Sequence, residues 1–385
     1  MGKSLYWIFS IFYALIFLVF FAIVPYIFLH SSLPEYVELL TKITIASVLS
    51  FLIALNLPFG YRLKLLRLKL NFNSTIYVFF SIFLLLIVVV FSTAEKIPII
   101  ESIKGADAAD LSYYRELFLK SRTGWQSSLV YFNAIITGAI LPYLIAIAFE
   151  RNHRHKFIFA ALFFLYCISF IEKAYFIKLA IPVFFVYLSQ VHNKKIFIVK
   201  GSIIIFILTF FMFLLSGSAI ENVSDDPFWS MAFTPVSPME QLFFRSIVVP
   251  IITSLDALRV FIEDFKGSYF YGSTSTFLAL ITGQERINFE RSLFEVQFGQ
   301  NLTETGNANS TFMIEAYINF GLPGVILFSF ILGKLIRFAI KSKDIAMLSI
   351  MPLFIFYLYN AGLIGTMLSN GFLFLFLIVR FVKFR

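Results

Sequence analysis

The sequence predicts an all-α polytopic membrane protein with about ten transmembrane helices and a large loop on one side of the membrane. Hydrophobic residues make up 59% of the chain and charged residues only 14%, whereas soluble domains average about 45–50% and about 25%. Apolar runs recur at the length that crosses a bilayer, about 17–25 residues. Clusters of Lys and Arg follow every second run, which is typical of polytopic membrane proteins.

The predicted spans follow from these apolar runs. The first begins after Lys3, is longer than a signal-peptide core of about 7–15 residues, and has no small-residue cleavage site after it, so we expect a retained helix. Two runs are short and are separated by Glu172-Lys173, which predicts tilted or broken helices. The ten expected spans are residues 5–29, 37–59, 75–93, 129–149, 157–171, 174–190, 196–216, 311–333, 344–361 and 366–382.

The basic residues orient these spans. With ten spans, 18 of the 31 Lys and Arg residues fall on one side, in the loops near 62–69, 151–156, 194–200 and 334–343 and at both termini. Loops rich in Lys and Arg stay in the cytoplasm, so we expect both termini there. The net charge of +9 is therefore a topology signal, and we expect no nucleic-acid partner.

The spans divide the chain into three regions. Residues 1–216 form a membrane region with seven spans and an outer loop at about 94–128. Residues 217–310 form the large outer loop, which holds 11 of the 22 acidic residues. Residues 311–385 supply the last three spans. Loops of this length usually have a function or structure of their own.

An amphipathic stretch inside the large loop, at about 238–264, is predicted to form interfacial or re-entrant helices that cap the membrane region. An eleventh span here would place the basic loop after residue 333 on the outer side. Arg245, Asp256 and Arg259 also make it unsuitable as a lipid-facing helix, and Pro250 is expected to kink it.

The usual chemical motifs are absent from the sequence. Three of the four histidines lie in the basic loops, and only His30 is on the side of the large loop. The single Cys167 lies within an apolar run, which excludes a disulfide framework. HExxH, P-loop, GxSxG and GxGxxG patterns do not occur. We expect no metal and no cofactor.

The stretch NANSTFMIEAYINFGLPGV places polar residues where a hydrophobic helix begins. At helical spacing, Asn307, Thr311, Glu315 and Asn319 form one polar stripe. A carboxylate at membrane depth usually faces a cavity or a partner, so Glu315 is a candidate catalytic base. The alternative for Glu315 is a buried structural pair with Lys or Arg. Asn309 is either a site residue or a helix N-cap.

A second candidate set consists of basic and aromatic residues at the outer boundary. Arg binds phosphate oxygens in bidentate fashion and Lys acts as a point charge, so a converging set suits a lipid-linked phosphate or pyrophosphate. Its members are Tyr114, Arg115, Lys173, Lys178, Arg245, Arg286 and Arg291.

Each member also has a structural interpretation. Lys178 is either a ligand or a snorkelling side chain. Arg286 and Arg291 are either ligands or solvated partners of Glu285 and Glu290. Arg245 lies in an apolar run, where an unpaired buried charge is costly.

Three stretches resemble the O-antigen or oligosaccharide repeat-unit polymerases of the Wzy type: DLSYYRE at 110–116, FFRSIVVP at 243–250, and NSTFMIEAYINFGLPGVILFSFILG at 309–333. The likeness in topology covers the whole chain, and the motifs cover about a tenth of it. It implies a GT-C-like helical fold in a bacterial inner membrane, with the large loop periplasmic. The chain also resembles the O-antigen ligases, but Ala308-Asn309 stands where those carry His-Asn.

The resemblance implies a metal-independent glycosyltransferase. Its donor and acceptor are undecaprenyl-pyrophosphate-linked glycans, and its partners are membrane lipids and a chain-length regulator protein. Arg245, with Arg115 and Lys173, would stabilise the leaving pyrophosphate. Glu315 would position or deprotonate the acceptor hydroxyl with help from Asn309, and Glu240 is the alternative base. Outer aromatic residues would stack on sugars, unless they form a membrane-interface belt; they are Tyr113, Tyr114, Trp229, Tyr269 and Tyr271.

Two other classes stay open. Another polyprenyl-dependent glycosyltransferase would carry an acidic metal or base site in the first outer loop, where Glu35 and Glu38 are candidates, and a chelator would abolish its activity. A lipid-linked glycan flippase or transporter would have charged residues along many helices and only short loops, unlike this chain.

Overall fold

Helices account for most of the described chain. The computed structural model describes residues 2–58, 68–120, 122–172, 175–215, 240, 243–298 and 306–385. Within them, five segments are long and apolar enough to cross a membrane: Ile8–Leu29, Pro34–Asn56, Phe72–Ser92, Gly124–Glu150 and Phe312–Ser342. These features bear out the prediction of an all-α membrane protein.

The first three expected spans are all helical. The first is α1 (Gly2–Leu18), which continues through the π-helical turn η1 (Val19–Ile23) into α2 (Val24–Leu29). Next come α3 (Pro34–Asn56) and α4 (Phe72–Ser92). The side chain of Asn71 caps α4 by accepting the backbone N–H groups of Asn73 and Ser74, which satisfies donors that have no partner inside the helix.

The predicted outer loop at 94–128 contains short helices: α5 (Pro98–Ile103), α6 (Ala108–Arg115), the π-helical turn η2 (Glu116–Lys120) and the 3₁₀ turn η3 (Gly124–Gln126). The fourth span follows as α7 (Ser127–Ile135), the π-helical turn η4 (Ile136–Ile140) and α8 (Leu141–Glu150).

Three apolar helices come next: α9 (Lys156–Ser169), α10 (Ile177–Gln190) and α11 (Lys194–Leu215). The first two have 14 residues each, or about 21 Å at the usual rise per residue. That length is less than the hydrocarbon thickness of about 30 Å, in keeping with the short runs in the sequence.

In the stretch 238–264, where we expected a pair of helices, the continuously described part from residue 243 onwards forms one helical segment. The π-helical turn η5 (Phe244–Val248) runs directly into α14 (Val249–Glu263). Residues 251–258 of α14 are all buried, so this helix lies inside the protein, packed against α3, α16 and α17. The shorter helices α15 (Thr276–Thr282) and α16 (Phe289–Phe298) follow.

After three of the π-helical turns, a proline is the second residue of the helix that follows. The helices after η1, η4 and η5 carry Pro25, Pro142 and Pro250 within their first two positions. Proline has no N–H group and its ring crowds the carbonyl of the preceding turn. A turn widened by one residue accommodates both effects, so each segment stays helical past its proline.

The eighth expected span is a broken helix. α17 (Phe312–Ser342) is interrupted at Gly321, whose φ of 65° and ψ of −160° are non-helical. The chain therefore forms a short helical piece, residues 312–320, before the long piece that starts at Leu322. Three further helices complete the chain: α18 (Ile345–Asn360), α19 (Leu363–Leu368) and α20 (Phe372–Phe381).

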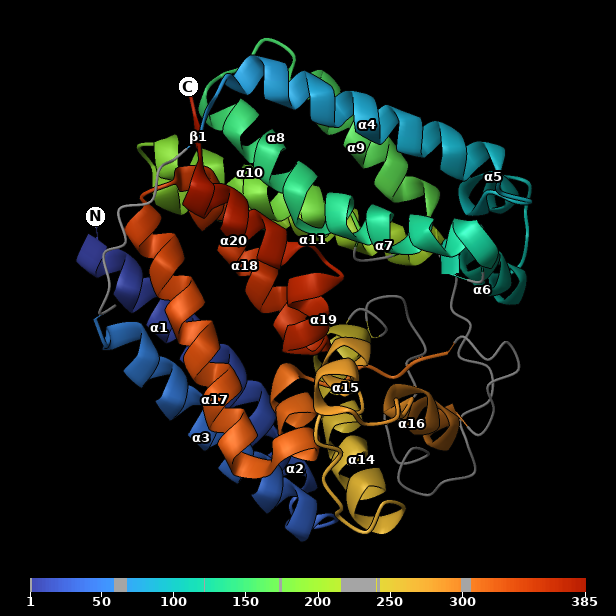
Figure 1. Cartoon of the computed structure of the whole chain (residues 1–385), viewed down its shortest axis with the longest axis vertical. Helices are drawn as coiled ribbons and strands as arrows, with labels where there is room; N and C mark the ends of the chain where they lie inside the picture. Colours follow the sequence, from blue (N-terminus) through green and yellow to red (C-terminus); the bar gives the residue numbers. More distant parts are fainter. Residues whose placement is uncertain are drawn as a thin grey trace.

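The two ends of the molecule carry different elements. Both termini lie at the same end as β1, whereas α5, α6 and α16 lie at the other end (Figure 1). At the terminal end, β1 (Leu68–Leu70) pairs in parallel with β2 (Val382–Phe384).

The pair α3 and α17 is the main helix contact. Ser47 Oγ accepts a 2.8 Å hydrogen bond from Ser329, and Ser50 donates a 2.7 Å bond to the Ile326 carbonyl. Gly333 lies against Ala54 with no room for a side chain. Small residues let membrane helices approach closely and hydrogen-bond. Ser47 pairs with Ser329, and further along both helices Arg337 donates to the Leu55 carbonyl and Lys334 to the Leu57 carbonyl, so the two helices are parallel.

Candidate functional site

Arg245 lies on the π-helical turn η5, at the start of the buried segment that leads into α14. The side chain is exposed. Desolvation by the protein around it lowers the pKa of its guanidinium, and the charge of Arg115 lowers it further. Arginine stays charged at physiological pH, so two like charges lie within electrostatic range of each other.

Arg115 is the last residue of α6 and is half-buried. Its Nε donates a hydrogen bond of 3.2 Å to the carbonyl of Leu111, which directs the guanidinium along the helix. Burial lowers the pKa of Arg115, while the carboxylates of Glu172 and Glu116 raise it. The tertiary structure thus brings together the two arginines that the sequence suggested for pyrophosphate, although 130 residues separate them in the chain.

Lys178 belongs to the same neighbourhood. Its side chain is buried at 7% exposure in α10, and its Nζ lies 3.6 Å from the ring centroid of Tyr175, a cation–π contact. The carboxylate of Glu172 lies within electrostatic range of Lys178. Lys178 is therefore held by an aromatic ring inside the protein. Lys173 lies outside the described residues.

Glu315 lies on the short piece of α17 and faces the start of α19. Its carboxylate accepts the backbone N–H groups of Leu363 and Ile364. A side chain at Gly362 would overlap the carboxylate, so only glycine leaves room for it there. Glu315 Oε2 is buried and has no hydrogen-bond partner among the described residues.

Two further hydroxyls close to this contact have no hydrogen-bond partner in the described part of the chain. They are Oγ1 of Thr311, one turn before Glu315, and Oγ1 of Thr366, whose N–H bonds to the Gly362 carbonyl. Buried polar atoms are nearly always hydrogen-bonded, to protein or to water. The meeting point of α17 and α19 can therefore accept hydrogen bonds from a polar ligand.

A charged residue of the large loop also lies near Glu315. The carboxylate of Glu290, at the start of α16, is within electrostatic range of it. Desolvation raises the pKa of Glu290, and the charge of Arg286 lowers it. The side chains of Glu290 and Arg286 are both exposed. Glu290 is therefore within electrostatic range of both Glu315 and Arg286.

The segment from Tyr359 to Ile364 links the surroundings of Arg245 to those of Glu315. The hydroxyl of Tyr359 donates a 3.3 Å hydrogen bond to the carbonyl of Ser246, the neighbour of Arg245. Four residues later, the Leu363 amide reaches Glu315. Four residues span at most about 14 Å, so both regions flank one short stretch of chain.

Asn319 is engaged by the protein. Its Oδ1 accepts the N–H of Gly272 at 2.8 Å, and its Nδ2 donates to Thr274 Oγ1 at 2.6 Å and to the Glu315 carbonyl at 2.8 Å. With 1% exposure, Asn319 holds the 270–274 loop against α17. Both of its side-chain N–H groups bond within the protein, so neither is left to bind a substrate.

The rest of the polar stripe is only partly helical. Asn307 and Asn309 precede the helix and are exposed, and Thr311 is the N-cap residue without a side-chain capping bond. Only Glu315 and Asn319 therefore lie on the helical face that the spacing predicted.

Other predicted site residues are placed as follows. Tyr114 accepts a 2.9 Å hydrogen bond from Lys96, whose ammonium also lies over the ring. Arg291 faces Glu295 at 3.7 Å, an ion pair within α16. Glu240 is half-buried.

The aromatic residues proposed for sugar stacking are only partly described. Tyr113, Tyr269 and Tyr271 are exposed, whereas Trp229 lies outside the described residues. Tyr269 also packs against Gly321, at the break in α17.

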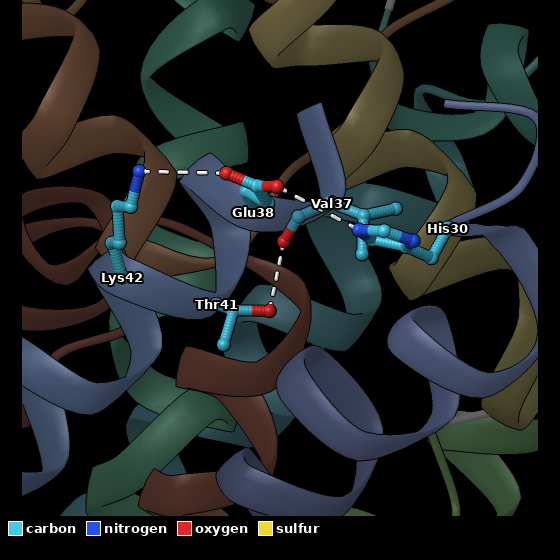
Figure 2. A network of polar contacts seen from close by, with 5 residues as sticks. All are labelled: His30, Val37, Glu38, Thr41 and Lys42. Carbon is cyan, nitrogen blue, oxygen red and sulfur yellow. Dashed lines mark hydrogen bonds and ion pairs between the residues drawn. The ribbon is translucent and has the colours of Figure 1, made fainter. Parts of the chain in front are cut away.

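Of the two acidic candidates in the first outer loop, Glu35 is exposed and Glu38 is engaged locally. Glu38 lies between His30 and Lys42, at 3.7 Å from each (Figure 2). In the part of the chain that the structure describes, no three His, Cys, Asp or Glu side chains form a metal-binding group.

Four residues near the site were not predicted as site residues from the sequence: Glu172, Glu290, Tyr359 and Gly362. In the sequence, Glu172 marks a break between two apolar runs and Glu290 is a possible ion-pair partner. Gly362, in the stretch NAGLIG, carries no signal that distinguishes it from other loop glycines.

No protein-family model matches the chain, and no curated protein or solved structure is significantly similar to it. The function must therefore be argued from the chemistry of the site and from the motif resemblance.

Proposed function

We propose that the protein is a membrane glycosyltransferase that polymerises undecaprenyl-pyrophosphate-linked oligosaccharide repeat units at the periplasmic face of a bacterial inner membrane. The observation that carries this proposal is that Arg245 lies within electrostatic range of Arg115. Arg115 ends α6, and α6 lies at the end of the molecule opposite both termini (Figure 1). An anion bound between two arginines offsets their mutual repulsion. Pyrophosphate is such an anion, and it also accepts bidentate hydrogen bonds from guanidinium groups.

The arrangement of the helices supports ten spans. With ten spans, the second and the eighth must both run from the outer to the inner side, and α3 and α17 are parallel. The basic loops then share one side with both termini, which is the side of β1 in Figure 1. The large loop, with Glu290 and Arg286, lies on the periplasmic side.

In the proposed reaction, a hydroxyl at the non-reducing end of the acceptor attacks the anomeric carbon of the donor glycan. The new bond joins that oxygen to the anomeric carbon, and the bond from the anomeric carbon to the pyrophosphate oxygen breaks. Arg245 and Arg115 stabilise the charge on the leaving lipid pyrophosphate. No metal is needed for this step.

Glu315 is the proposed acceptor-binding carboxylate. The amides of Leu363 and Ile364 hold it in one orientation, and its unpartnered Oε2 is directed at the acceptor hydroxyl, whose proton it accepts. Thr311 and Thr366 bring additional hydroxyls to the same place. A sugar, which carries several hydroxyls, matches this set better than an apolar substrate.

The first test uses cells that lack the gene and carry wild type, Arg245→Ala or Glu315→Gln at equal membrane levels. We expect wild type to restore the glycan ladder, and both variants to leave a single repeat unit on the core lipid. Lys104→Ala is the matched control. Lys104 is an exposed basic residue just after α5 and forms an ion pair of 2.8 Å with Glu101. This variant should restore the full ladder.

The same experiment separates the alternatives. Full ladders from both variants would refute the site assignment. A core lipid without any repeat unit in the absence of the gene would instead indicate a flippase or a ligase. Dependence of ladder length on a co-expressed chain-length regulator would support the expected protein partner.

A further inference from the structure

A cavity lies at the end of the molecule opposite the proposed glycan site. Its volume is about 500 Å³, within the range of about 300–1,000 Å³ that is usual for small-ligand sites. It opens where the β1–β2 ribbon meets the start of α4 and the turn between α8 and α9. Seven residues line it: Phe72, Asn73, Tyr77, Arg151, His153, Arg154 and Arg385.

The lining is basic. Three of the seven residues are arginines and none is acidic. Neither Arg154 nor Arg385 forms an ion pair with any acidic residue in the described part of the chain. The charge of Glu150 reaches Arg151, but the Glu150 carboxylate accepts the backbone N–H of Ala346 and does not line the cavity.

The cavity wall is fixed by contacts within the protein. Arg151 donates a 3.0 Å hydrogen bond to the Phe384 carbonyl, and its guanidinium lies 5.1 Å from the Phe72 ring centroid. Tyr77 bonds His155 at 2.8 Å. A wall held in this way loses little freedom when a ligand binds.

His153 adds a neutral donor to this wall. Its Nδ1 accepts the N–H of His155 at 3.1 Å, and burial together with the charge of His155 lowers the pKa of His153. The neutral ring then carries its proton on Nε2. A neutral N–H beside three guanidinium groups suits a ligand rich in acceptor oxygens.

We propose that this cavity binds a phosphate group. Arg154 and Arg385 bind the phosphate, and Arg151, which the protein holds in place, forms part of the wall behind it. Guanidinium groups match the geometry of phosphate oxygens. The phosphate belongs either to an anionic lipid headgroup or to a free phosphate. Basic pockets beside membrane helices on the cytoplasmic side bind anionic headgroups, and the basic loops place this cavity on that side.

The test measures thermal unfolding of the full-length protein in neutral detergent, with cardiolipin or inorganic phosphate titrated in and phosphatidylcholine as the neutral lipid. A ligand that binds only the folded state raises the unfolding temperature in a saturable manner. We compare wild type with Arg154→Gln/Arg385→Gln. Arg151 stays unchanged, because its contacts with Phe384 and Phe72 also serve the fold.

We expect cardiolipin to stabilise wild type in a saturable manner. Its affinity for the double variant should be lower by about tenfold or more. A tenfold loss of affinity corresponds to about 1.4 kcal/mol. The matched control is Lys195→Gln/Lys200→Gln, which removes two exposed bases of α11 and should respond as wild type does.

Saturable stabilisation by inorganic phosphate, lost in the same double variant, would support the site with a free phosphate as its ligand. Two results would overturn the proposal: no saturable stabilisation by either probe, or an equal response from wild type and the arginine variant. These readouts do not depend on glycan polymerisation, so they stand apart from the proposed function.

Discussion

Replacing Gly321 by alanine tests the break in α17. At φ 65° and ψ −160°, the backbone is in a region that side chains other than glycine avoid, at a cost of about 1–3 kcal/mol. A Cβ atom at Gly321 would also lie 3.0 Å from Cζ of Tyr269, closer than usual. We therefore expect Gly321→Ala to lower the free energy of unfolding by about 2–3 kcal/mol.

The assay is equilibrium unfolding in mixed micelles, with sodium dodecyl sulfate as the denaturant and helix content as the signal. Gly365→Ala is the matched control, because a Cβ atom there meets nothing within 4 Å and its φ is not positive. Alanine has the higher helix propensity, so this control should be unchanged or more stable by up to about 1 kcal/mol.

A second substitution separates backbone strain from the contact with Tyr269. In the Tyr269→Leu background, the ring that crowds the new Cβ is gone, but the backbone cost remains. Gly321→Ala should still destabilise that background by about 1–3 kcal/mol. Equal stability of wild type and Gly321→Ala would refute the reasoning, since it would mean that α17 passes Gly321 with ordinary helical geometry.

Three more outcomes are expected. Asn319→Ala should cost about 2–3 kcal/mol in the unfolding assay, because the buried N–H of Gly272 and the hydroxyl of Thr274 lose their partner. Gly333→Leu should cost about 1–3 kcal/mol by overpacking, since its Cβ would meet Ala54 at 2.7 Å. Glycan transfer by purified protein should be unchanged by a chelator.

Each of these has a contradicting result. Retained stability in Asn319→Ala would show that the 270–274 loop does not depend on its clamp. Retained stability in Gly333→Leu would show that α3 and α17 leave room for a leucine side chain between Gly333 and Ala54. Loss of transfer with chelator, restored by a divalent cation, would favour a metal-dependent glycosyltransferase.

The two proposed sites lie at opposite ends of the helices. The arginine pair and Glu315 lie with the large loop, and the basic cavity lies with the β1–β2 ribbon (Figure 1). The broken helix α17 belongs to the first site. Backbone that departs from helical geometry at membrane depth is tolerated only where it is buried in protein or lines a cavity, and here the 270–274 loop covers the break.

Parts of the candidate site could be predicted because their signals are local. A carboxylate at the start of an apolar run and an arginine inside one are costly wherever the chain places them, so Glu315 and Arg245 were recognisable from their neighbours in sequence. Asn319 was recognisable as a polar residue in an apolar helix. Its clamp on Gly272 was not, since the partner lies 47 residues away.

The sequence by itself determined that the chain is a bundle of apolar helices, because the length of a membrane span and the position of basic loops depend on contiguous residues. Only the tertiary structure decided which of these helices touch. The approach of Arg115 to Arg245 and the seating of Glu315 on the first amides of α19 depend on contacts between segments far apart in the chain. Such contacts arise from side-chain packing over many elements at once, and hydrophobic periodicity does not record them.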